Sequence, residues 1–450
     1  MMEYHFIGIG GIGMSGLAKI LLQSGKKVRG SDIASSWVTE ELQKEGAEVF
    51  IKHEASQVPA NAKVIYSSDI QKGNVEYLES RKRSLPMLHR SALLQELMKD
   101  SEALLVTGTH GKTTTSSLLA HVLVSCGLDP SYCIGGVVRS LGSQAGHGKS
   151  SLFVAEADES DGSFLAYTPK GAILTNIDAD HLVHWGTEER LVQGFLDFYH
   201  KVSCKEWFFW CADDVKLSSL SLEGVSYGFS PSSDLRIIEV AYLGWKTRFS
   251  FTWKGRTYNE IEIPLIGVHN VLNASAVIGL CLQMGIEEEK VFSSLQTFLG
   301  AGRRCEKKGE LAGIAVYDDY GHHPTEIHTT LNAIRIAGQG RRIVALFQPH
   351  RYTRVKDCFS SFGQALIPAD LVLMTDIYGA GEVPIEGIDT KSLYEKIRSQ
   401  GHTMCKYVPR DKIIEETLAS LIPGDIVVTM GAGDITKMGP LLLERLASWL

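Results

Sequence analysis

The hydrophobic pattern of the chain switches repeatedly between short apolar runs and apolar positions at helical spacing. The first apolar run covers residues 4–9 and ends in glycines, and the positions that follow it at helical spacing are Met14, Leu17, Ala18, Leu21 and Leu22. A strand that enters a tight turn and then an amphipathic helix is the repeating unit of parallel α/β folds. Gly25 ends this helix, and residues 27–32 form the next predicted strand. The pattern therefore predicts a doubly wound α/β domain at the start of the chain.

The same unit starts again twice, which predicts three domains. We expect them over residues 1–100, 101–300 and 301–450, with later strands at 103–107, 152–155, 172–175, 343–347, 371–375 and 426–430. Between residues 225 and 264 apolar and polar side chains alternate, and Lys254-Gly255 resembles a hairpin turn. Such alternation is typical of antiparallel strands. The second domain is therefore expected to carry an antiparallel patch beside its parallel strands.

Composition narrows the class of protein. The 450 residues carry a formal charge of −7 with 22% charged positions, which disfavours a strongly basic nucleic-acid-binding protein. No apolar run approaches the roughly 18 residues of a membrane span, and the beginning, MMEYHFIGIG, lacks the basic and apolar regions of a signal peptide. The eight cysteines form no CxxC pair, so we expect neither structural zinc nor disulfides. We expect a cytoplasmic protein that binds neither nucleic acid nor membrane.

A glycine loop follows the first predicted strand. The run Gly8-Ile9-Gly10-Gly11-Ile12-Gly13 matches GxGxxG, and Asp32 ends the next strand. Glycines let the backbone approach a pyrophosphate, which the N–H groups and dipole of the following helix stabilise. The pattern by itself favours NAD binding and leaves an ordinary glycine-rich turn as the alternative.

A second glycine loop, GTHGKTTT at residues 108–115, links a predicted strand to a helix. In such a loop the backbone N–H groups hold phosphates, Lys112 reaches the β and γ oxygens, and the Thr113 hydroxyl coordinates Mg²⁺. Gly108 and Gly111 stand closer together than in the usual GxxxxGK(S/T) motif. The motif predicts a nucleotide phosphate site, with a plain strand-to-helix turn as the alternative.

Two acidic clusters follow the next predicted strands, EADESD at residues 156–161 and NIDADH at residues 176–181. Because open parallel sheets bind ligands at the carboxyl ends of their strands, Glu156 is placed to hold Mg²⁺ and His181 is expected at the same edge. The remaining acids are expected to be solvated turn residues and helix caps, namely Asp158, Asp161, Asp178 and Asp180.

The third domain offers two polar motifs, DDYGHHPTE at residues 318–326 and HRYTR at residues 350–354, and each follows a predicted strand. The guanidinium groups of Arg351 and Arg354 can grip a carboxylate or phosphate in bidentate fashion. A solvated loop is the alternative for each motif. The chain has no GxSxG elbow, which gives a covalent hydrolase little support.

Taken together, these motifs resemble the signatures of the Mur ligase family, in order and along essentially the whole chain. They are HFIGIGGIGMSGLA (5–18), GSD (30–32), GTHGKTTT (108–115), EADESD (156–161), GVHNVLNA (267–274), GRR (302–304), DDYGHHPTE (318–326) and HRYTR (350–354). The resemblance implies a Rossmann-like N-terminal domain for a UDP-sugar, a central P-loop ATPase-like domain, and a Rossmann-like C-terminal domain that closes over ATP and the amino acid. It also changes the first glycine loop from an NAD site into a site for the UDP pyrophosphate.

The activity that the resemblance implies is ATP-dependent amide formation. It would join L-alanine to the lactyl carboxylate of UDP-N-acetylmuramate through an acyl phosphate, with Mg²⁺, in peptidoglycan precursor synthesis. The implied assembly is a monomer or a weak homodimer. Three rivals stay open: a recycling ligase that attaches a tripeptide to the same UDP-sugar, an NAD-dependent dehydrogenase, and an inactive UDP-sugar-binding regulator.

Carried over position by position, the resemblance assigns site residues to all three domains. The implied UDP-sugar contacts are Gly8, Gly10, Gly11, Gly13, Ser31, Asp32 and Ser67. The implied ATP contacts are Gly108, Thr109, Gly111, Lys112, Thr113, Thr114, His269, Asn270, Asn273, Arg304 and Asp319. The implied L-alanine pocket consists of Tyr320, His322, Arg351 and Arg354. Lys112, Glu156 and His181 would be catalytic, and the implied metal ligands are Thr113, Glu156 and His181.

Two segments depart from the family pattern. After His181 the family usually continues with an acidic residue and a Tyr-Gly pair, whereas this chain reads LVHWGT at residues 182–187. Before His53 a glycine is usual, and Lys52 stands here. The departures concern the detail of the UDP-sugar site and the segment after His181, and they leave the expected reaction class unchanged.

Overall fold

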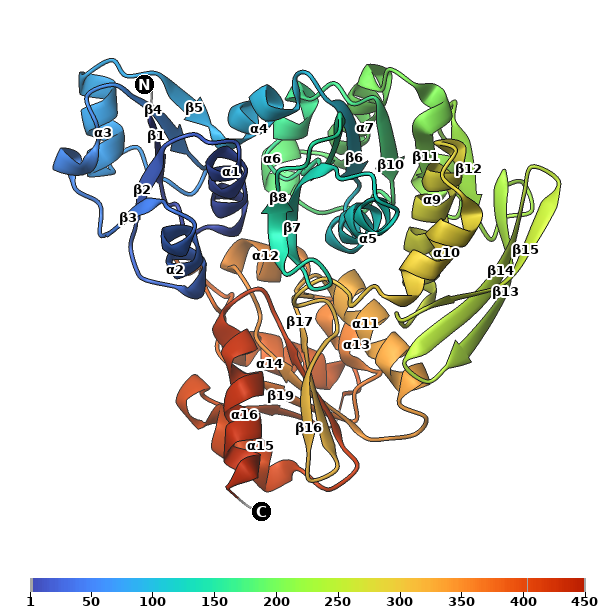
Figure 1. The fold of residues 1–450 in the computed structure, drawn as a ribbon. Coiled ribbons are helices and arrows are strands. Elements are labelled where there is room, and N and C mark those ends of the chain that lie inside the picture. Colours follow the sequence, from blue (N-terminus) through green and yellow to red (C-terminus); the bar gives the residue numbers. More distant parts are fainter. Residues whose placement is uncertain (1–2, 403, 449–450) are drawn as a thin grey trace. The chain divides into compact units, whose positions relative to one another are not determined.

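The computed structural model describes residues 3–402 and 404–448. The chain contains three sheets (Figure 1) and folds into two compact units. One unit comprises Met1–Ile238, Ser250–Asn259 and Leu272–Leu299, and the other comprises Glu239–Phe249, Glu260–Val271 and Gly300–Leu450. No helix within the described residues has the length and apolar character needed to cross a membrane. The predicted α/β class is confirmed, and the three expected domain ranges remain predictions.

The first sheet is fully parallel, with the strand order β3-β2-β1-β4-β5. Its strands are β1 (Glu3–Ile7), β2 (Val28–Asp32), β3 (Glu48–Ile51), β4 (Ala62–Tyr66) and β5 (Met87–His89), and its helices are α1 (Ile12–Gln23), α2 (Trp37–Lys44), α3 (Val75–Lys82) and α4 (Arg90–Met98). The strand order reverses between β1 and β4, and folds of this kind bind ligands at the carboxyl ends of the strands beside that point. The first glycine loop lies there, at the end of β1.

The second sheet has the strand order β15-β14-β13-β12-β11-β10-β6-β9-β7-β8. Its parallel part consists of β6 (Glu102–Thr107), β7 (Ser131–Val138), β9 (Leu152–Glu156), β10 (Gly171–Leu174), β11 (Phe208–Cys211) and β12 (Val225–Gly228), and β8 (Ser143–Gly146) runs antiparallel to β7. The helices of this region are α5 (Lys112–Ser125), α6 (Leu182–Trp185), α7 (Glu188–Lys201), α8 (Val215–Ser218), α9 (Val268–Gln283) and α10 (Glu288–Gln296). Because β6 lies between β9 and β10, the second glycine loop has a strand end on either side.

The antiparallel patch is smaller than the sequence pattern predicts. It consists of β13 (Leu235–Leu243), β14 (Lys246–Trp253) and β15 (Arg256–Ile263), which are consecutive strands joined by short turns. The preceding strand β12 pairs in parallel with both β11 and β13, so the prediction of antiparallel pairing from residue 225 was wrong at its start. The predicted turn is confirmed, because Lys254 (φ +51°) and Gly255 (φ +76°) both adopt the left-handed conformation that two-residue hairpin turns favour.

The third sheet has the strand order β16-β17-β21-β18-β19-β20 and is parallel apart from β16. Its strands are β16 (Glu306–Leu311), β17 (Ile314–Asp319), β18 (Ile343–Phe347), β19 (Leu371–Met374), β20 (Cys405–Tyr407) and β21 (Ile426–Met430), and its helices are α11 (Pro324–Ala337), α12 (Tyr352–Asp357), α13 (Phe362–Leu366), α14 (Thr390–Ser399), α15 (Ile413–Ser420) and α16 (Met438–Ala447). Alternate residues of β18 pack into two separate apolar clusters, Ile343 with Ala345 and Phe347 in one, and Val344 with Leu346 in the other. Both faces of the sheet are therefore covered, which explains the continuous apolar runs of its strands.

Candidate active site

Three strand ends meet around the second glycine loop. β6 leads into residues 108–111, β9 ends at Glu156, and β10 leads into Thr175 and Asn176. The strand register pairs Val106 with Glu156 and Thr107 with Leu174. These ends therefore lie together at the carboxyl edge of the sheet, where α/β proteins bind their ligands.

A glycine conformation and hydrogen bonds to Asn176 hold the backbone of the second glycine loop in place. Gly111 has a φ of +85°, and a Cβ atom at this position would lie 3.1 Å from Oδ1 of Asn273 on α9, so glycine is the residue that fits. Asn176 accepts hydrogen bonds from the backbone N–H groups of Thr109 (3.0 Å) and His110 (2.9 Å). Helix α5 begins directly after the loop, and the first N–H groups of a helix attract anions.

Lys112 is the first residue of α5, and its ammonium group is fully engaged. Nζ donates hydrogen bonds to the carbonyl oxygens of Gly108 (2.7 Å) and Thr109 (3.0 Å) and to Oε2 of Glu159 (2.7 Å). Burial alone would lower the pKa of Lys112, but the neighbouring carboxylates, above all Glu159, outweigh it and hold this pKa above its ordinary value. Lys112 is therefore a charged ammonium group at the phosphate loop.

Glu159 is a site residue that the sequence did not reveal. Its side chain is only 1% exposed, and burial raises the pKa of Glu159 to about 7 against the opposing attraction of Lys112. The sequence places it inside EADESD, where it looks like one acid among several. Only the pairing of β9 with β6 shows that this acid, rather than its neighbours, reaches Lys112.

Glu156 and Thr113 form a cluster of oxygen atoms beside the loop. The Thr113 and Ser116 hydroxyls donate to the two carboxylate oxygens of Glu156 at 3.3 and 3.2 Å, and the Gly135 backbone N–H donates to Oε1 at 2.7 Å. Carboxylate and hydroxyl oxygens are the ligands that Mg²⁺ prefers. The donor set therefore fits a hard divalent cation.

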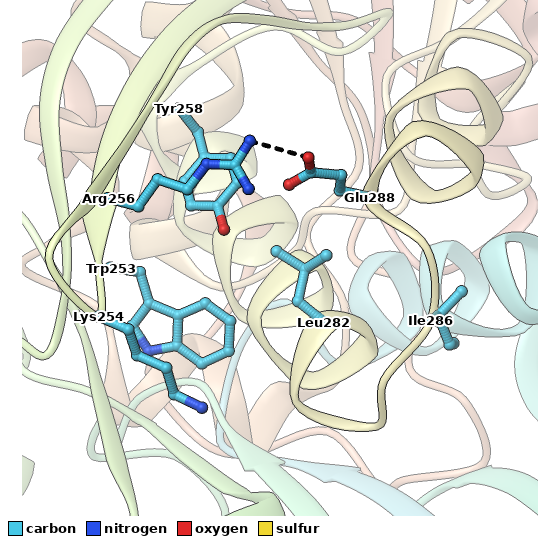
Figure 2. A pocket seen from close by; sticks show the side chains of 7 residues that line it. All are labelled: Trp253, Lys254, Arg256, Tyr258, Leu282, Ile286 and Glu288. Atoms are coloured by element: carbon cyan, nitrogen blue, oxygen red, sulfur yellow. Dashed lines mark hydrogen bonds and ion pairs between the residues drawn. The ribbon is translucent and has the colours of Figure 1, made fainter.

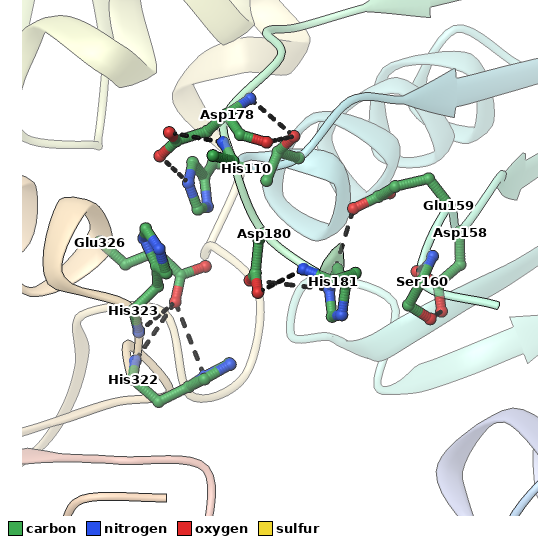
Figure 3. Close-up of polar contacts among 12 residues, drawn as sticks. His110, Asp158, Glu159, Ser160, Asp178, Asp180, His181, His322, His323 and Glu326 are labelled. Atoms are coloured by element: carbon green, nitrogen blue, oxygen red, sulfur yellow. Dashed lines mark hydrogen bonds and ion pairs between the residues drawn. The ribbon is translucent and has the colours of Figure 1, made fainter. Parts of the chain in front are cut away.

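His181 lies on the other side of Glu159. Its Nε2 atom is 3.9 Å from Oε1 of Glu159 and 3.6 Å from Oδ2 of Asp180 (Figure 3). The residue has a φ of +57° and stands directly before α6. Trp185, the last residue of α6, donates its indole N–H to the Glu159 carbonyl oxygen at 3.0 Å. The segment after His181, which departs from the family pattern, is thus tied to the EADESD loop.

The remaining acids of the two clusters are partly solvated, as expected for turn residues: Asp158, Asp161, Asp178 and Asp180. Asp158 and Asp161 accept hydrogen bonds from the backbone N–H groups of Ser160 and Ser163, respectively. Asp178 contacts Nε2 of His110 at 2.9 Å (Figure 3), and Thr109 Oγ1 accepts from the Asp178 N–H at 2.9 Å.

Arg90 connects the first sheet to this edge. Its guanidinium group lies 3.7 Å from Asp158 and 3.6 Å from Asp161. A Cβ atom on Gly13 of the first glycine loop would lie 3.7 Å from Arg90 Nη1. No motif in the sequence marks Arg90, because it is the first residue of an ordinary helix, α4.

Asp32 holds the first glycine loop through hydrogen bonds to the backbone. The carboxylate of Asp32 accepts hydrogen bonds from the N–H of Gly10 and from the N–H of Ile33, both at 2.8 Å. Gly8 and Gly11 lie between β1 and α1, Gly13 lies in the first turn of α1, and Ser67 follows β4 at the same carboxyl edge. Ser31 is fully buried, and its hydroxyl contacts Glu76 and His53 at 2.7 and 2.8 Å. The Ser31 side chain is therefore engaged beneath the loop.

At the carboxyl edge of the third sheet, Asp319 is the last residue of β17 and Tyr320 follows it. The buried Asp319 carboxylate accepts hydrogen bonds from the N–H groups of Cys305 and Gly321, both at 2.8 Å. Burial raises the pKa of Asp319 to about 6 against the attraction of Arg304. The guanidinium of Arg304 lies 5.1 Å from the centre of the Tyr320 ring. The structure thus brings three of the predicted residues together in the second compact unit.

The residues predicted to bind the amino acid lie along the same edge. The His322 ring packs edge-on against Tyr320 at 5.3 Å and against His350 at 5.6 Å, and the N–H of His322 donates to Glu326 at 3.2 Å (Figure 3). Burial, together with His322 and the nearby arginines, lowers the pKa of His350 to about 3. Arg351 precedes α12, and Arg354 lies in its first turn. Two cations and aromatic rings therefore line the end of β18.

The predicted ATP contacts on α9 belong to different compact units. His269 and Asn270 lie in the second unit and Asn273 in the first, because the division crosses α9 after Val271. Burial lowers the pKa of His269 to about 4, and Asn270 donates to the Ile266 carbonyl oxygen at 2.8 Å. Asn273 is the one of the three that contacts the phosphate loop within its own unit.

A pocket of about 350 Å³ lies elsewhere, between the β14–β15 turn and helices α9 and α10 (Figure 2). Trp253, Tyr258 and Leu282 form part of its wall, and Arg256 pairs with Glu288 at 2.8 Å across it. None of the predicted site residues lines this pocket. We therefore assign the chemistry to the strand ends.

Comparison with known proteins places the chain in one family. Three family models match it in order: the Mur ligase family catalytic domain over residues 3–102, the Mur ligase middle domain over residues 106–281, and the Mur ligase glutamate ligase domain over residues 303–433.

Individual relatives match along the whole length. The UDP-N-acetylmuramate–L-alanine ligase of Protochlamydia amoebophila is 46% identical over 99% of this chain and 98% of its own. The corresponding ligase of an Anaeromyxobacter species is 44% identical over the same shares of the two chains. The crystal structure of the MurC ligase from Thermotoga maritima superposes with a TM-score of 0.86 at 29% identity and covers 100% of both chains. The chain therefore belongs to the Mur ligase family.

Proposed function

We propose that this protein joins L-alanine to the lactyl carboxylate of UDP-N-acetylmuramate and converts ATP to ADP and phosphate, in peptidoglycan precursor synthesis. The observation that supports this most is the similarity over 99% of the chain to relatives named for that reaction. The retained phosphate loop, with Lys112 charged and Glu156 beside it, supplies the groups that phosphoryl transfer from ATP needs. Active ligase chemistry is therefore favoured over an inactive UDP-sugar-binding protein.

In the first step, an oxygen of the lactyl carboxylate attacks the γ-phosphorus of ATP. The bond from this phosphorus to the β,γ-bridging oxygen breaks, ADP leaves with the electron pair, and an acyl phosphate remains. The difficulty is that two anions must meet. Lys112 would move its charge from Glu159 to the phosphate oxygens, and its position at the start of α5 places the helix N–H groups beside the same oxygens.

The residues present fit a bound Mg²⁺. Thr113 and Glu156 offer oxygen ligands at the loop, and we propose His181 as the third ligand. When bound, Mg²⁺ would neutralise negative charge on the phosphate oxygens. The Ser116 hydroxyl and the Gly135 N–H hold the Glu156 carboxylate in place for this role.

In the second step, the amine of L-alanine attacks the acyl carbon. The amide bond forms, phosphate leaves, and the amine nitrogen loses its proton. We propose that Arg351 and Arg354 bind the alanine carboxylate while Tyr320 and His322 line the pocket around it, which orients the amine.

We also propose five further ATP contacts outside the phosphate loop, namely His269, Asn270, Asn273, Arg304 and Asp319.

We propose the division of labour that the resemblance implies. Residues 1–100 would bind the UDP-sugar, residues 101–300 would bind ATP, and residues 301–450 would close on ATP and the amino acid. We expect the protein to act in the cytoplasm as a monomer or weak homodimer. Small-angle scattering with and without all substrates tests the closure, and identical profiles would count against it.

The decisive experiment is phosphate release by the purified protein with Mg-ATP and UDP-N-acetylmuramate. L-alanine, other amino acids and the tripeptide are added in turn, and the products are identified by mass spectrometry. We expect release that needs all three substrates and yields the alanyl adduct. Turnover with the tripeptide alone would identify the recycling ligase, and binding of the UDP-sugar without any turnover would identify a regulator.

A Lys112→Ala variant tests the assignment of the phosphate loop. We expect kcat to fall by about 100-fold or more, as is usual when a charge-stabilising group is removed. Lys99→Ala, at an exposed position on the end of α4, is the matched control and should retain activity. Calorimetry with UDP should show unchanged binding in both variants, because Lys112 lies in the second sheet region.

A further inference from the structure

A buried carboxylate lies beneath the first glycine loop and has no role in the reaction described so far. Glu76 on α3 is 0% exposed. It accepts hydrogen bonds from Ser31 Oγ at 2.7 Å and from the backbone N–H of Glu54 at 3.1 Å, and it contacts His5 Nε2 at 3.0 Å. Among residues 3–402 and 404–448, its only ion-pairing partners are the histidines His5 and His53. Burying a carboxylate without a Lys or Arg partner lowers the stability of the fold unless hydrogen bonds compensate. We therefore looked for a function of Glu76 in the contacts of its hydrogen-bond partners.

The hydrogen bonds around Glu76 fix the orientation of a second side chain. The Ser31 hydroxyl has one proton and donates it to Glu76. Its oxygen lies 2.8 Å from Nδ1 of His53, so His53 must be the donor there. The Glu76–Ser31–His53 relay therefore keeps the proton of His53 on Nδ1. In a neutral imidazole this leaves Nε2 as a hydrogen-bond acceptor.

His53 is the one member of the relay that reaches the surface. Its side chain is 16% exposed, whereas Glu76 and Ser31 are buried. It follows β3, and β3 pairs with β2 in a register that places Ile51 beside Asp32. The relay thus ends at the carboxyl edge of the sheet, next to the residue that closes the glycine loop.

This position corresponds to the nucleoside end of a bound dinucleotide. In such folds the pyrophosphate sits on the glycine loop, and the ribose lies at the acidic residue that ends the second strand. Here both carboxylate oxygens of Asp32 already accept backbone N–H groups. The neighbouring His53 can add an acceptor of its own at that edge.

We propose that His53 accepts a hydrogen bond from the uridine part of the UDP-sugar and that Glu76 is its positioning residue, acting through Ser31. The inference rests on the proposed function of the N-terminal glycine loop as the UDP-sugar site. Uridine offers two groups of this chemistry, the ribose hydroxyls and the N3–H of the base. Ser31, which the family resemblance places among the ligand contacts, acts here from below as the link between Glu76 and His53.

Calorimetric titration of the full-length protein with UDP tests the proposal through paired variants. Asn can replace the Nδ1 donor of histidine but leaves the outer acceptor absent, whereas Gln can reach the position of Nε2. We expect His53→Asn to raise the Kd for UDP about tenfold, the loss of one hydrogen bond in a polar site. His53→Gln keeps an acceptor at the outer position but loses the Nδ1 donor to Ser31, so its Kd should lie between those of the parent and of His53→Asn. ADP binding to the second glycine loop should be unchanged in both variants, which also shows that they are folded.

The Glu76→Gln variant distinguishes a role of Glu76 in orienting His53 from a role in the stability of the fold alone. If Glu76 acts through His53, the variant raises the Kd for UDP about tenfold, and the double variant with His53→Asn is no weaker than His53→Asn alone, because both changes remove one interaction. In turnover assays, these variants should raise KM for the UDP-sugar and leave kcat unchanged. Additive losses, or a lowered kcat at unchanged KM, would contradict the relay.

A comparison of UDP with 2′-deoxy-UDP identifies the uridine group. If His53 accepts from the ribose 2′-hydroxyl, His53→Asn binds the two ligands equally well. If the partner lies elsewhere on the uridine, the substitution weakens both ligands by the same factor. Parent-like UDP binding in His53→Asn would overturn this inference alone, whereas a parent protein that binds neither UDP nor the UDP-sugar would overturn the proposed function as well.

Discussion

Lys112 Nζ lies 2.7 Å from Oε2 of Glu159, and this carboxylate is only 1% exposed. Glu159 is thus the counterion of the lysine that is expected to bind the phosphates of ATP. Bound phosphates would compete with Glu159 for the same ammonium group. Breaking the pair costs free energy because it leaves a buried charge without a partner.

The first prediction concerns this competition. Glu159→Gln should weaken the protein without nucleotide by about 3 kcal/mol, since Lys112 loses its buried counterion, and should bind ADP about tenfold more tightly, since no carboxylate opposes the phosphates. Urea unfolding and calorimetric titration measure the two effects. Glu96→Gln, on an exposed acid that pairs with Lys63, is the control. A variant that binds ADP more weakly than the parent would show that Glu159 assists the loop instead of competing with it.

The second prediction addresses the unusual segment after His181. Trp185→Phe removes the indole N–H that donates to the Glu159 carbonyl oxygen at 3.0 Å and keeps an aromatic ring near Phe164. We expect a loss of about 1 kcal/mol in the free energy of unfolding and a fall in kcat, because His181 directly precedes α6, which ends at Trp185. Trp37→Phe, at a residue that is 56% exposed, should change neither. Equal kcat in both variants would separate Trp185 from the placement of His181.

The third prediction concerns Lys52, which stands where the family usually has glycine. Lys52 has a φ of +76°, a conformation that costs a non-glycine residue about 1 kcal/mol or more. Lys52→Gly should therefore raise the free energy of unfolding by about 0.5–1 kcal/mol, after the greater freedom of glycine in the unfolded chain is counted. Lys72→Gly, also at an exposed position, should bring no gain. Thermal unfolding of both variants checks this, and a loss of stability in Lys52→Gly would mean that the lysine side chain itself contributes.

The fourth prediction concerns the loss of stability at low pH. Because the pKa of His350 is lowered to about 3 in the fold and is about 6.5 in the unfolded chain, only the unfolded state gains this proton as the pH falls through 6.5. The free energy of unfolding therefore decreases from pH 6.5 towards pH 3. His350→Gln should reduce the loss between pH 7 and pH 5 by about 1–2 kcal/mol. Urea unfolding at both pH values measures it, with the exposed His328→Gln as control; equal losses in the two variants would contradict the shifted pKa.

The parallel strands were the part of the fold that could be predicted best from the sequence. The strands at 343–347 and 426–430 were predicted with the bounds that β18 and β21 have. Such strands are covered on both faces, so their apolar runs are continuous and end sharply. The antiparallel patch could be predicted less well from the sequence. β12 reads like its antiparallel neighbours, and its parallel pairing depends on β11 and β13, which local pattern does not encode.

The candidate site divides in the same way. The two glycine loops, Lys112 and Glu156 could be named from the sequence, because a phosphate loop needs its glycines, its lysine and its helix in consecutive positions. Glu159, Arg90 and the buried Glu76 could not. Each acts on a residue from another strand or helix, and nothing in its neighbouring sequence distinguishes it from an ordinary surface charge.

Local chain chemistry was sufficient for the α/β class, the order of the motifs and the family, since hydrophobic period and consecutive loop residues are read along the chain. Which residues the buried acidic side chains contact is determined only by the tertiary structure. Glu159 faces Lys112 because β9 pairs with β6, and Glu76 of α3 meets Ser31 of β2 only once the domain is folded. A buried charge is stabilised by whichever group the folded sheet brings within about 3 Å, and that distance is a property of the assembled strands.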